Sequence, residues 1–105
     1  MKAKRVIPRE AAAKDVEAVV DYYQREAGPH IAFRFIESLA KAYDHIGRYP
    51  QTGSPRYAHE LNLPGLRSWP LKRFPYSIFY LDQDEHIDVW RVLSSERDIP
   101  VWLRN

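Results

Sequence analysis

Two amphipathic helical patterns, separated by almost no connector, constrain the fold of this chain most strongly. The first begins near Pro8 and stops at Gly28-Pro29, where glycine can adopt a left-handed cap and proline cannot continue the helix. The second runs to about Gly47. The apolar positions at spacings of three and four are Ala12, Val16, Val19, Val20 and Tyr23, then Ala32, Phe35, Leu39, Ala42 and Ile46. So short a connector makes the helices an antiparallel hairpin, whose wide apolar stripes need a third surface to cover them.

The C-terminal half supplies that surface. Segments 67–72, 75–82 and 86–93 are rich in aromatic and β-branched residues, and the breaks between them are short and turn-like. This pattern predicts an antiparallel three-stranded meander. Because Pro70 cannot donate a backbone hydrogen bond, its strand should lie at a sheet edge or carry a bulge.

Residues 3–7 predict a short first strand, after which Pro8 would begin the helix. The fold class is therefore α+β, with the order β-α-α-β-β-β and the helical hairpin packed on one face of a small, mainly antiparallel sheet. We expect a single domain over residues 1–105. The long connection 50–66 should be functional or contain a short turn of helix.

Composition excludes several classes of protein. The chain has no cysteine, and its four histidines are scattered, so no metal site is predicted. It has no Gly-rich phosphate loop or paired catalytic carboxylates, and we expect no cofactor. No apolar run could span a membrane or serve as a secretory signal, so the chain is predicted to be cytoplasmic. The net charge of +2 allows contact with nucleic acid but does not require it.

The last predicted strand places an arginine among apolar residues. Strict alternation puts Ile87, Val89, Arg91 and Leu93 on one face and Trp90 on the other. An arginine in that position calls for a partner or a nearby edge. Two interpretations stay open: the uncovered face of the sheet is a basic surface that binds a macromolecule, or its arginines form ordinary salt bridges. Its aromatic residues could likewise stack on bases, although core packing is the commoner role.

Several stretches, taken in order, resemble the RelE/ParE toxin superfamily and in particular its ParE-like, or plasmid stabilisation, branch. The most telling are GLRSWP at 65–70, FPYSIFY at 74–80 and VWRVL at 89–93. The likeness covers nearly the whole chain, and its other matching stretches are 8–16, 22–23, 32–36, 49–53 and 97–100.

This resemblance implies the toxin of a type II toxin–antitoxin system, neutralised by a cognate antitoxin whose C-terminal segment folds onto it in a hetero-oligomer. ParE-like toxins are associated with inhibition of DNA gyrase, whereas RelE-like toxins cut mRNA on the ribosome. Cleavage needs groups that accept and donate protons. RelE-like enzymes often place a Tyr or His near the C-terminus, and residues 97–105 contain neither. Ser94, Ser95 and Glu96 stand where many relatives carry a His after the last strand.

We therefore expect a gyrase inhibitor that acts by protein–protein contact, is not an enzyme, and does not itself bind DNA sequence-specifically. The alternatives are a ribosome-dependent mRNA endonuclease and a non-toxic binding module. The predicted target-binding residues are Arg67, Lys72, Arg73, Trp90, Arg91, Arg97 and Trp102. The predicted antitoxin-binding residues, which could instead only seal the hairpin to the sheet, are Tyr22, Tyr23, Phe33 and Tyr43.

Overall fold

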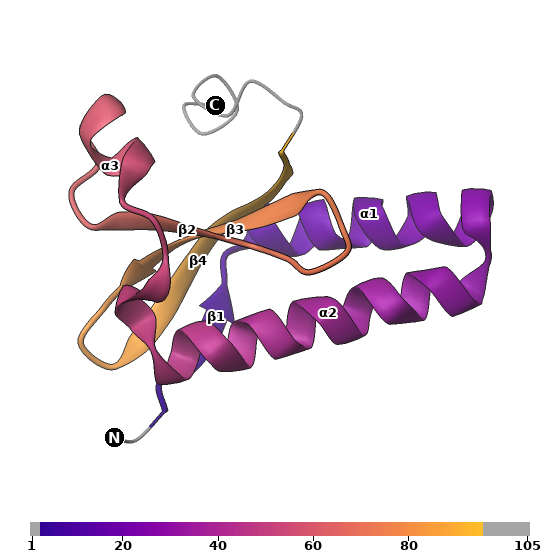
Figure 1. The fold of residues 1–105 in the computed structure, drawn as a ribbon, viewed down its shortest axis with the longest axis horizontal. Coiled ribbons are helices and arrows are strands. Elements are labelled where there is room, and N and C mark those ends of the chain that lie inside the picture. The colour runs from indigo at the N-terminus through magenta and orange to yellow at the C-terminus, as the bar shows by residue number, and fades with distance from the viewer. Residues whose placement is uncertain (1–2, 96–105) are drawn as a thin grey trace.

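The predicted order of elements is confirmed in a computed structural model, which describes residues 3–95 (Figure 1). The elements are β1 (Arg5–Pro8), α1 (Glu10–Ala27), α2 (Pro29–Arg48), the 3-10 helix η1 (Pro50–Thr52), α3 (Arg56–Glu60), β2 (Leu66–Pro70), β3 (Tyr76–Asp82) and β4 (His86–Ser94). Gly28 alone separates α1 from α2, and its φ of 91° is one that other residues rarely adopt. The connection 50–66 contains two short helical segments, as expected for its length.

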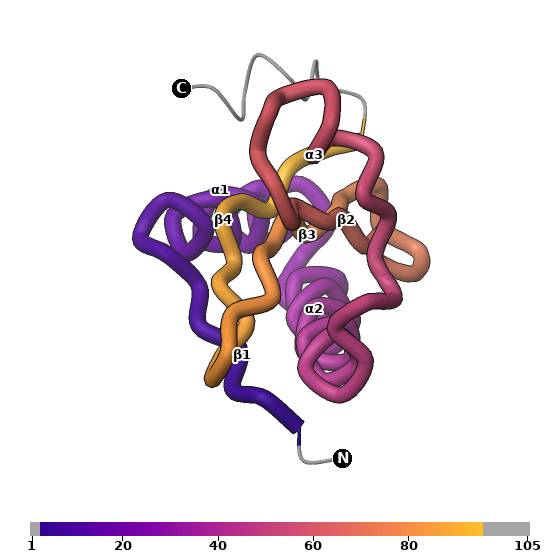
Figure 2. The backbone as a smooth tube through the Cα atoms, turned by 90° about the vertical axis from the view of Figure 1, so that its left-hand side faces the viewer, coloured from indigo at the N-terminus to yellow at the C-terminus, as the bar shows by residue number. Residues whose placement is uncertain are grey.

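The sheet has four strands in the order β1-β4-β3-β2 (Figure 2). Strands β2, β3 and β4 form the predicted antiparallel meander, and β1 pairs with β4 in parallel. Strand β2 lies at the edge of the sheet, which confirms the expectation drawn from Pro70.

The predicted role of Pro8 as the first residue of the helix is wrong. Pro8 ends β1 opposite Val89, and α1 begins at Glu10 with Arg9 at its N-cap. Because β1 is the other edge of the sheet, the missing N–H of proline leaves no interior ladder interrupted. The backbone N–H of Arg9 still donates to the carbonyl of Val89 at 2.9 Å, so the helix starts directly from the sheet.

The helical hairpin packs on one face of the sheet and forms the main core. Phe35 and Ile46 of α2 meet Ile78, Tyr80 and Ile87 of the sheet, all fully buried. The prediction that the second face of the sheet is uncovered is wrong in part, because α3 and the residues after it lie over that face (Figures 1 and 2). A second apolar cluster forms there from Leu66, Phe79 and Leu93 with Tyr57, Ala58, Leu61, Leu63 and Leu81.

The prediction that side chains along β4 alternate strictly between the two faces of the sheet is also wrong, because the strand contains a β-bulge. Tyr80 pairs with Val89 and Phe79 pairs with Arg91, so Trp90 is an extra residue without a partner in β3. One inserted residue reverses the faces that follow it. Val92 therefore joins the hairpin-facing core, whereas Leu93 packs in the second cluster.

A buried tyrosine ties the long connection to the sheet. The Tyr80 hydroxyl donates to the carbonyl of Pro50 at 2.7 Å and accepts from the N–H of Gly53 at 3.0 Å. Burial raises the pKa of this phenol, so it keeps the proton that it donates. A Cβ on Gly53 would lie 2.5 Å from the Tyr80 hydroxyl, which leaves room only for glycine.

We expect Tyr80→Phe to lower the free energy of unfolding by about 1–3 kcal/mol, because two buried backbone groups lose their partner. Urea unfolding followed by circular dichroism measures this change. The matched control is Tyr49→Phe, whose side chain is 62% exposed and which should alter stability little. Equal stability of the two variants would contradict the role assigned to the Tyr80 hydroxyl.

Candidate functional site

An aspartate of α1 closes the exposed end of β4. Strand β1 pairs with β4 only as far as Val89, so no strand among residues 3–95 lies along the outer edge of β4 beyond that residue. The Asp15 carboxylate accepts two hydrogen bonds from the Arg91 guanidinium, at 2.7 and 2.8 Å, and one from the Val92 N–H at 3.0 Å. The side chains of Arg91 and Asp15 are only 16% and 15% exposed. The hydrogen bond to Asp15 raises the pKa of Arg91, so this arginine stays charged.

A groove of about 770 Å³ lies beside this contact, between α1 and the ends of β3 and β4. Its lining is mainly apolar and aromatic, and Tyr22, half exposed, forms part of its α1 wall. The lining residues are Asp15, Ala18, Val19, Tyr22, Tyr23, Pro75, Tyr76, Val92, Leu93 and Ser94. We call this the α1–β4 groove. The groove lies beside a stretch of β4 that pairs with no further strand of residues 3–95, and its apolar side chains suit an extended or helical segment of another chain.

The four residues predicted to bind the antitoxin separate into two groups. Tyr22 and Tyr23 line the α1–β4 groove, and Tyr23 also packs edge-on against Phe74. Phe33 lies outside the groove on α2 and is 59% exposed. Tyr43 is half-buried against the core, where burial and the charge of Asp15 raise its pKa to about 12.

The residues predicted to bind the target that lie within 3–95 do not form one cluster. Arg67 donates to the carbonyls of Gln51 and Gly53, at 3.2 and 2.7 Å, and so helps to hold the connection. Lys72 and Arg73 are exposed in the turn between β2 and β3. Arg91 forms the salt bridge that the alternative interpretation allowed, although its partner comes from α1 and not from a neighbouring strand. Arg97 and Trp102 lie outside the described residues.

Sequence reasoning missed a second arginine. The Arg9 guanidinium lies 4.5 Å from the centre of the Trp90 ring and donates to Asp88 at 2.9 and 2.7 Å. Asp88 is 8% exposed, and the hydrogen bond from Arg9 lowers its pKa. The signal that could have found this pair is a carboxylate in an otherwise apolar strand, since a buried charge needs a partner.

Residues 3–95 contain neither a cluster of metal ligands nor a helix suited to a membrane. No group of three or more His, Asp or Glu side chains in this part of the chain could hold a metal ion. None of the helices described here is long and apolar enough to cross a membrane.

The helical hairpin on a four-stranded sheet is the α+β fold of the RelE/ParE toxin superfamily. A solved structure titled "Chromosomal ParDE TA system from P. aeruginosa" has a similar fold, with a TM-score of 0.72 and 21% sequence identity over 88% of this chain and 96% of that chain. Residues 6–99 match the family described as ParE toxin of type II toxin-antitoxin system, parDE. The chain therefore belongs to the ParE toxin family. No curated protein matches its sequence.

The Arg9–Asp88 contact predicts a pH dependence of stability. The folded state lowers the pKa of Asp88, so this carboxylate stabilises the fold above its unfolded pKa of about 3.9, and the contribution is lost as the pH falls through the lower folded value. Asp88→Asn should therefore lower the free energy of unfolding at neutral pH by about 1–2 kcal/mol. When the pH is lowered from about 6 to about 3, the free energy of unfolding should fall less in this variant than in wild type.

Urea unfolding at the two pH values measures both effects. The control is Asp44→Asn, since Asp44 forms an exposed i,i+4 pair with Arg48 and should contribute little. The explanation fails if wild type and Asp88→Asn lose the same stability on acidification.

Proposed function

We propose that this chain is the toxin of a type II toxin–antitoxin pair that inhibits DNA gyrase by direct contact and has no catalytic step of its own. The observation that carries this proposal is the match to the ParE toxin family over residues 6–99. The target and the absence of catalysis are inferences from that membership and from the bonding of the arginines on the sheet.

Three arginines on or beside the sheet, Arg9, Arg67 and Arg91, are already bonded within the chain. Cleavage of RNA through its 2′-hydroxyl needs cationic groups directed at the phosphate, together with a proton acceptor and donor. Arg67 is bonded to backbone carbonyls, and Arg91 and Arg9 are each bonded to a carboxylate. To reach a phosphate they would have to leave partly buried partners, at a cost of about 1.5–3 kcal/mol for each charged hydrogen bond. This cost supports a toxin that works by contact.

The target is tested with the purified toxin in two parallel assays, gyrase supercoiling of relaxed plasmid and ribosome-dependent cleavage of mRNA. We expect supercoiling to decrease with toxin concentration while the mRNA stays intact. Specific cuts in the mRNA with supercoiling unchanged would instead assign the chain to the RNA-cleaving branch. A toxin that affects neither assay and does not slow growth when induced without antitoxin would be a non-toxic binding module.

We further propose that the cognate antitoxin inserts a segment into the α1–β4 groove. Antitoxin segments that become ordered on binding need apolar side chains to pack against, and the apolar and aromatic lining of this groove supplies them. Tyr22 is 50% exposed on the wall of this groove, and such aromatic residues often contribute much of the binding energy of an interface.

Tyr22→Ala should weaken binding of the antitoxin encoded beside this gene about tenfold or more, because it removes a large apolar contact in the groove. Calorimetric titration measures the affinity, and the fold should remain stable because the side chain is half exposed. Tyr49→Ala is a matched aromatic control outside the groove. A large loss for Phe33→Ala with none for Tyr22→Ala would place the antitoxin on α2 and contradict this assignment.

A further inference from the structure

Three aromatic rings form a column where the end of α2 meets β2. His45 stacks on Trp69 with ring centres 4.6 Å apart and an angle of 18° between the planes. The Tyr49 ring follows 5.3 Å from His45 and is tilted by 47° to it, so only the His45–Trp69 pair is stacked. The Thr52 hydroxyl lies 3.2 Å from Nε2 of His45 and helps to hold this ring. Tyr49 is 62% exposed, the most exposed large hydrophobic side chain among residues 3–95, so one end of the column faces solvent.

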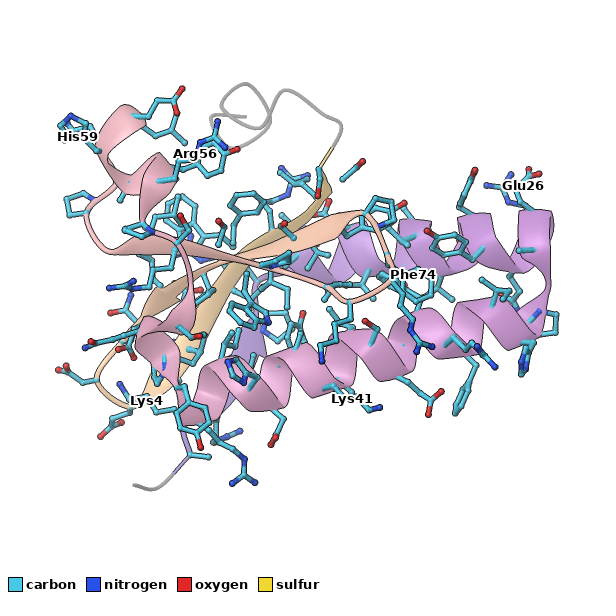
Figure 3. The ribbon with its side chains drawn as sticks, in the orientation of Figure 1. Lys4, Glu26, Lys41, Arg56, His59 and Phe74 are labelled. Atoms are coloured by element: carbon cyan, nitrogen blue, oxygen red, sulfur yellow. The ribbon has the colours of Figure 1, made fainter. Side chains whose placement is uncertain are left out.

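Cationic side chains of α2 follow the same side of the molecule. Arg34, Lys41 and Arg48 recur every seven residues, so they lie on one stripe of the helix about 10 Å apart along its axis. Figure 3 shows Lys41 projecting outward from α2. A shallow hollow of about 470 Å³ lies along this stripe next to the column, and both Lys41 and Tyr49 line it.

The turn between β2 and β3 adds two more cations. The Ser38 hydroxyl donates to the backbone carbonyl of Lys72 at 2.9 Å, which holds this turn against the same helix. Lys72 and its neighbour Arg73 are exposed. Within residues 3–95, neither of them forms a salt bridge, and neither do Arg34 and Lys41. The surface therefore combines a stacked ring pair and the exposed Tyr49 with four cations that form no salt bridge within residues 3–95. Arg48, by contrast, is paired with Asp44, and both line the same hollow.

We propose that this surface binds a single strand of nucleic acid without sequence preference. Single-strand binding combines cations that contact the phosphate backbone with aromatic rings on which bases stack. Bases within a duplex already stack on one another and could not use Tyr49, so the exposed column favours a single strand. An acidic protein segment would use the cations, but its carboxylate side chains have no flat base that could stack on the rings.

This inference goes beyond inhibition of gyrase, and neither depends on the other. The surface shares no residue with the α1–β4 groove, whose lining comes from α1, β3 and β4 and from the residue before β3. A toxin bound to its antitoxin in that groove could therefore still bind the strand.

The test is fluorescence anisotropy of the purified toxin with labelled oligothymidylate, oligouridylate and a duplex, each of about 12 nucleotides. We expect both single strands to bind with a dissociation constant on the order of 10⁻⁴–10⁻⁶ M at low salt, and more weakly as salt rises. The duplex should bind at least fivefold more weakly. The thymidylate and uridylate arms show whether DNA or RNA is the better ligand, and preference for either supports the proposal.

Two sets of variants separate stacking from general charge. Tyr49→Ala should weaken single-strand binding about fivefold or more, whereas Tyr49→Phe should retain it, because the ring supplies the stacking. The double variant Lys41→Glu, Lys72→Glu should weaken binding about tenfold or more and reduce the salt dependence. The matched control is Lys14→Glu, Arg25→Glu, which makes the same change in net charge on α1.

Three outcomes would overturn the proposal. The first is the absence of single-strand binding, and the second is an equal affinity for the duplex. The third is a loss of affinity in the Lys14/Arg25 double variant equal to that in the Lys41/Lys72 double variant, which would mean that net charge alone determines the affinity. Binding of poly-glutamate as tight as that of the strands, with no effect of Tyr49→Ala, would instead assign the surface to an acidic protein. Circular dichroism of each variant checks that the fold is retained.

Discussion

Strand β4 is the element on which the rest of the structure depends, since it pairs with β1 on one side and with β3 on the other. The N-terminal and C-terminal halves of the chain are joined through it. It also determines where α1 lies, because Arg9 bonds to Asp88 at the start of the helix and Asp15 bonds to Arg91 further along it. Both bonds are bidentate, a geometry that orients as well as attracts.

Different contacts cover the backbone hydrogen-bonding groups at the edges of this small sheet. At β2, Ser54 and Ser68 exchange two backbone hydrogen bonds, and Pro70 offers no donor. At the end of β4 the Asp15 carboxylate replaces a neighbouring strand by accepting the Val92 N–H. The α1–β4 groove lies beside this Asp15 contact. The same contact that completes the fold therefore creates the surface on which a partner chain can pack.

The two proposed surfaces have different physical characters because they are built from different elements. The α1–β4 groove is apolar and aromatic, and charged side chains near it are already paired, as Asp15 is with Arg91. The surface along α2 carries the exposed Tyr49 ring beside the stacked His45–Trp69 pair, together with cations that form no salt bridge within residues 3–95, such as Lys41 and Lys72. A protein segment gains most from the first and a nucleic-acid strand from the second. The two proposed surfaces share no residue, so we expect no direct competition between their ligands.

The sequence by itself determined the two helices and the meander, and it limited β2 to a sheet edge or a bulge, because each depends on a local signal such as the Gly28-Pro29 break or the missing N–H of Pro70. It also indicated that Arg91 needs a partner. Only the tertiary structure decided that the partner is Asp15, 76 residues away, and that a bulge at Trp90 reverses the faces of β4. The physical reason is that an ion pair or a bulge depends on which elements lie side by side, and periodicity within one element carries no information about its neighbours.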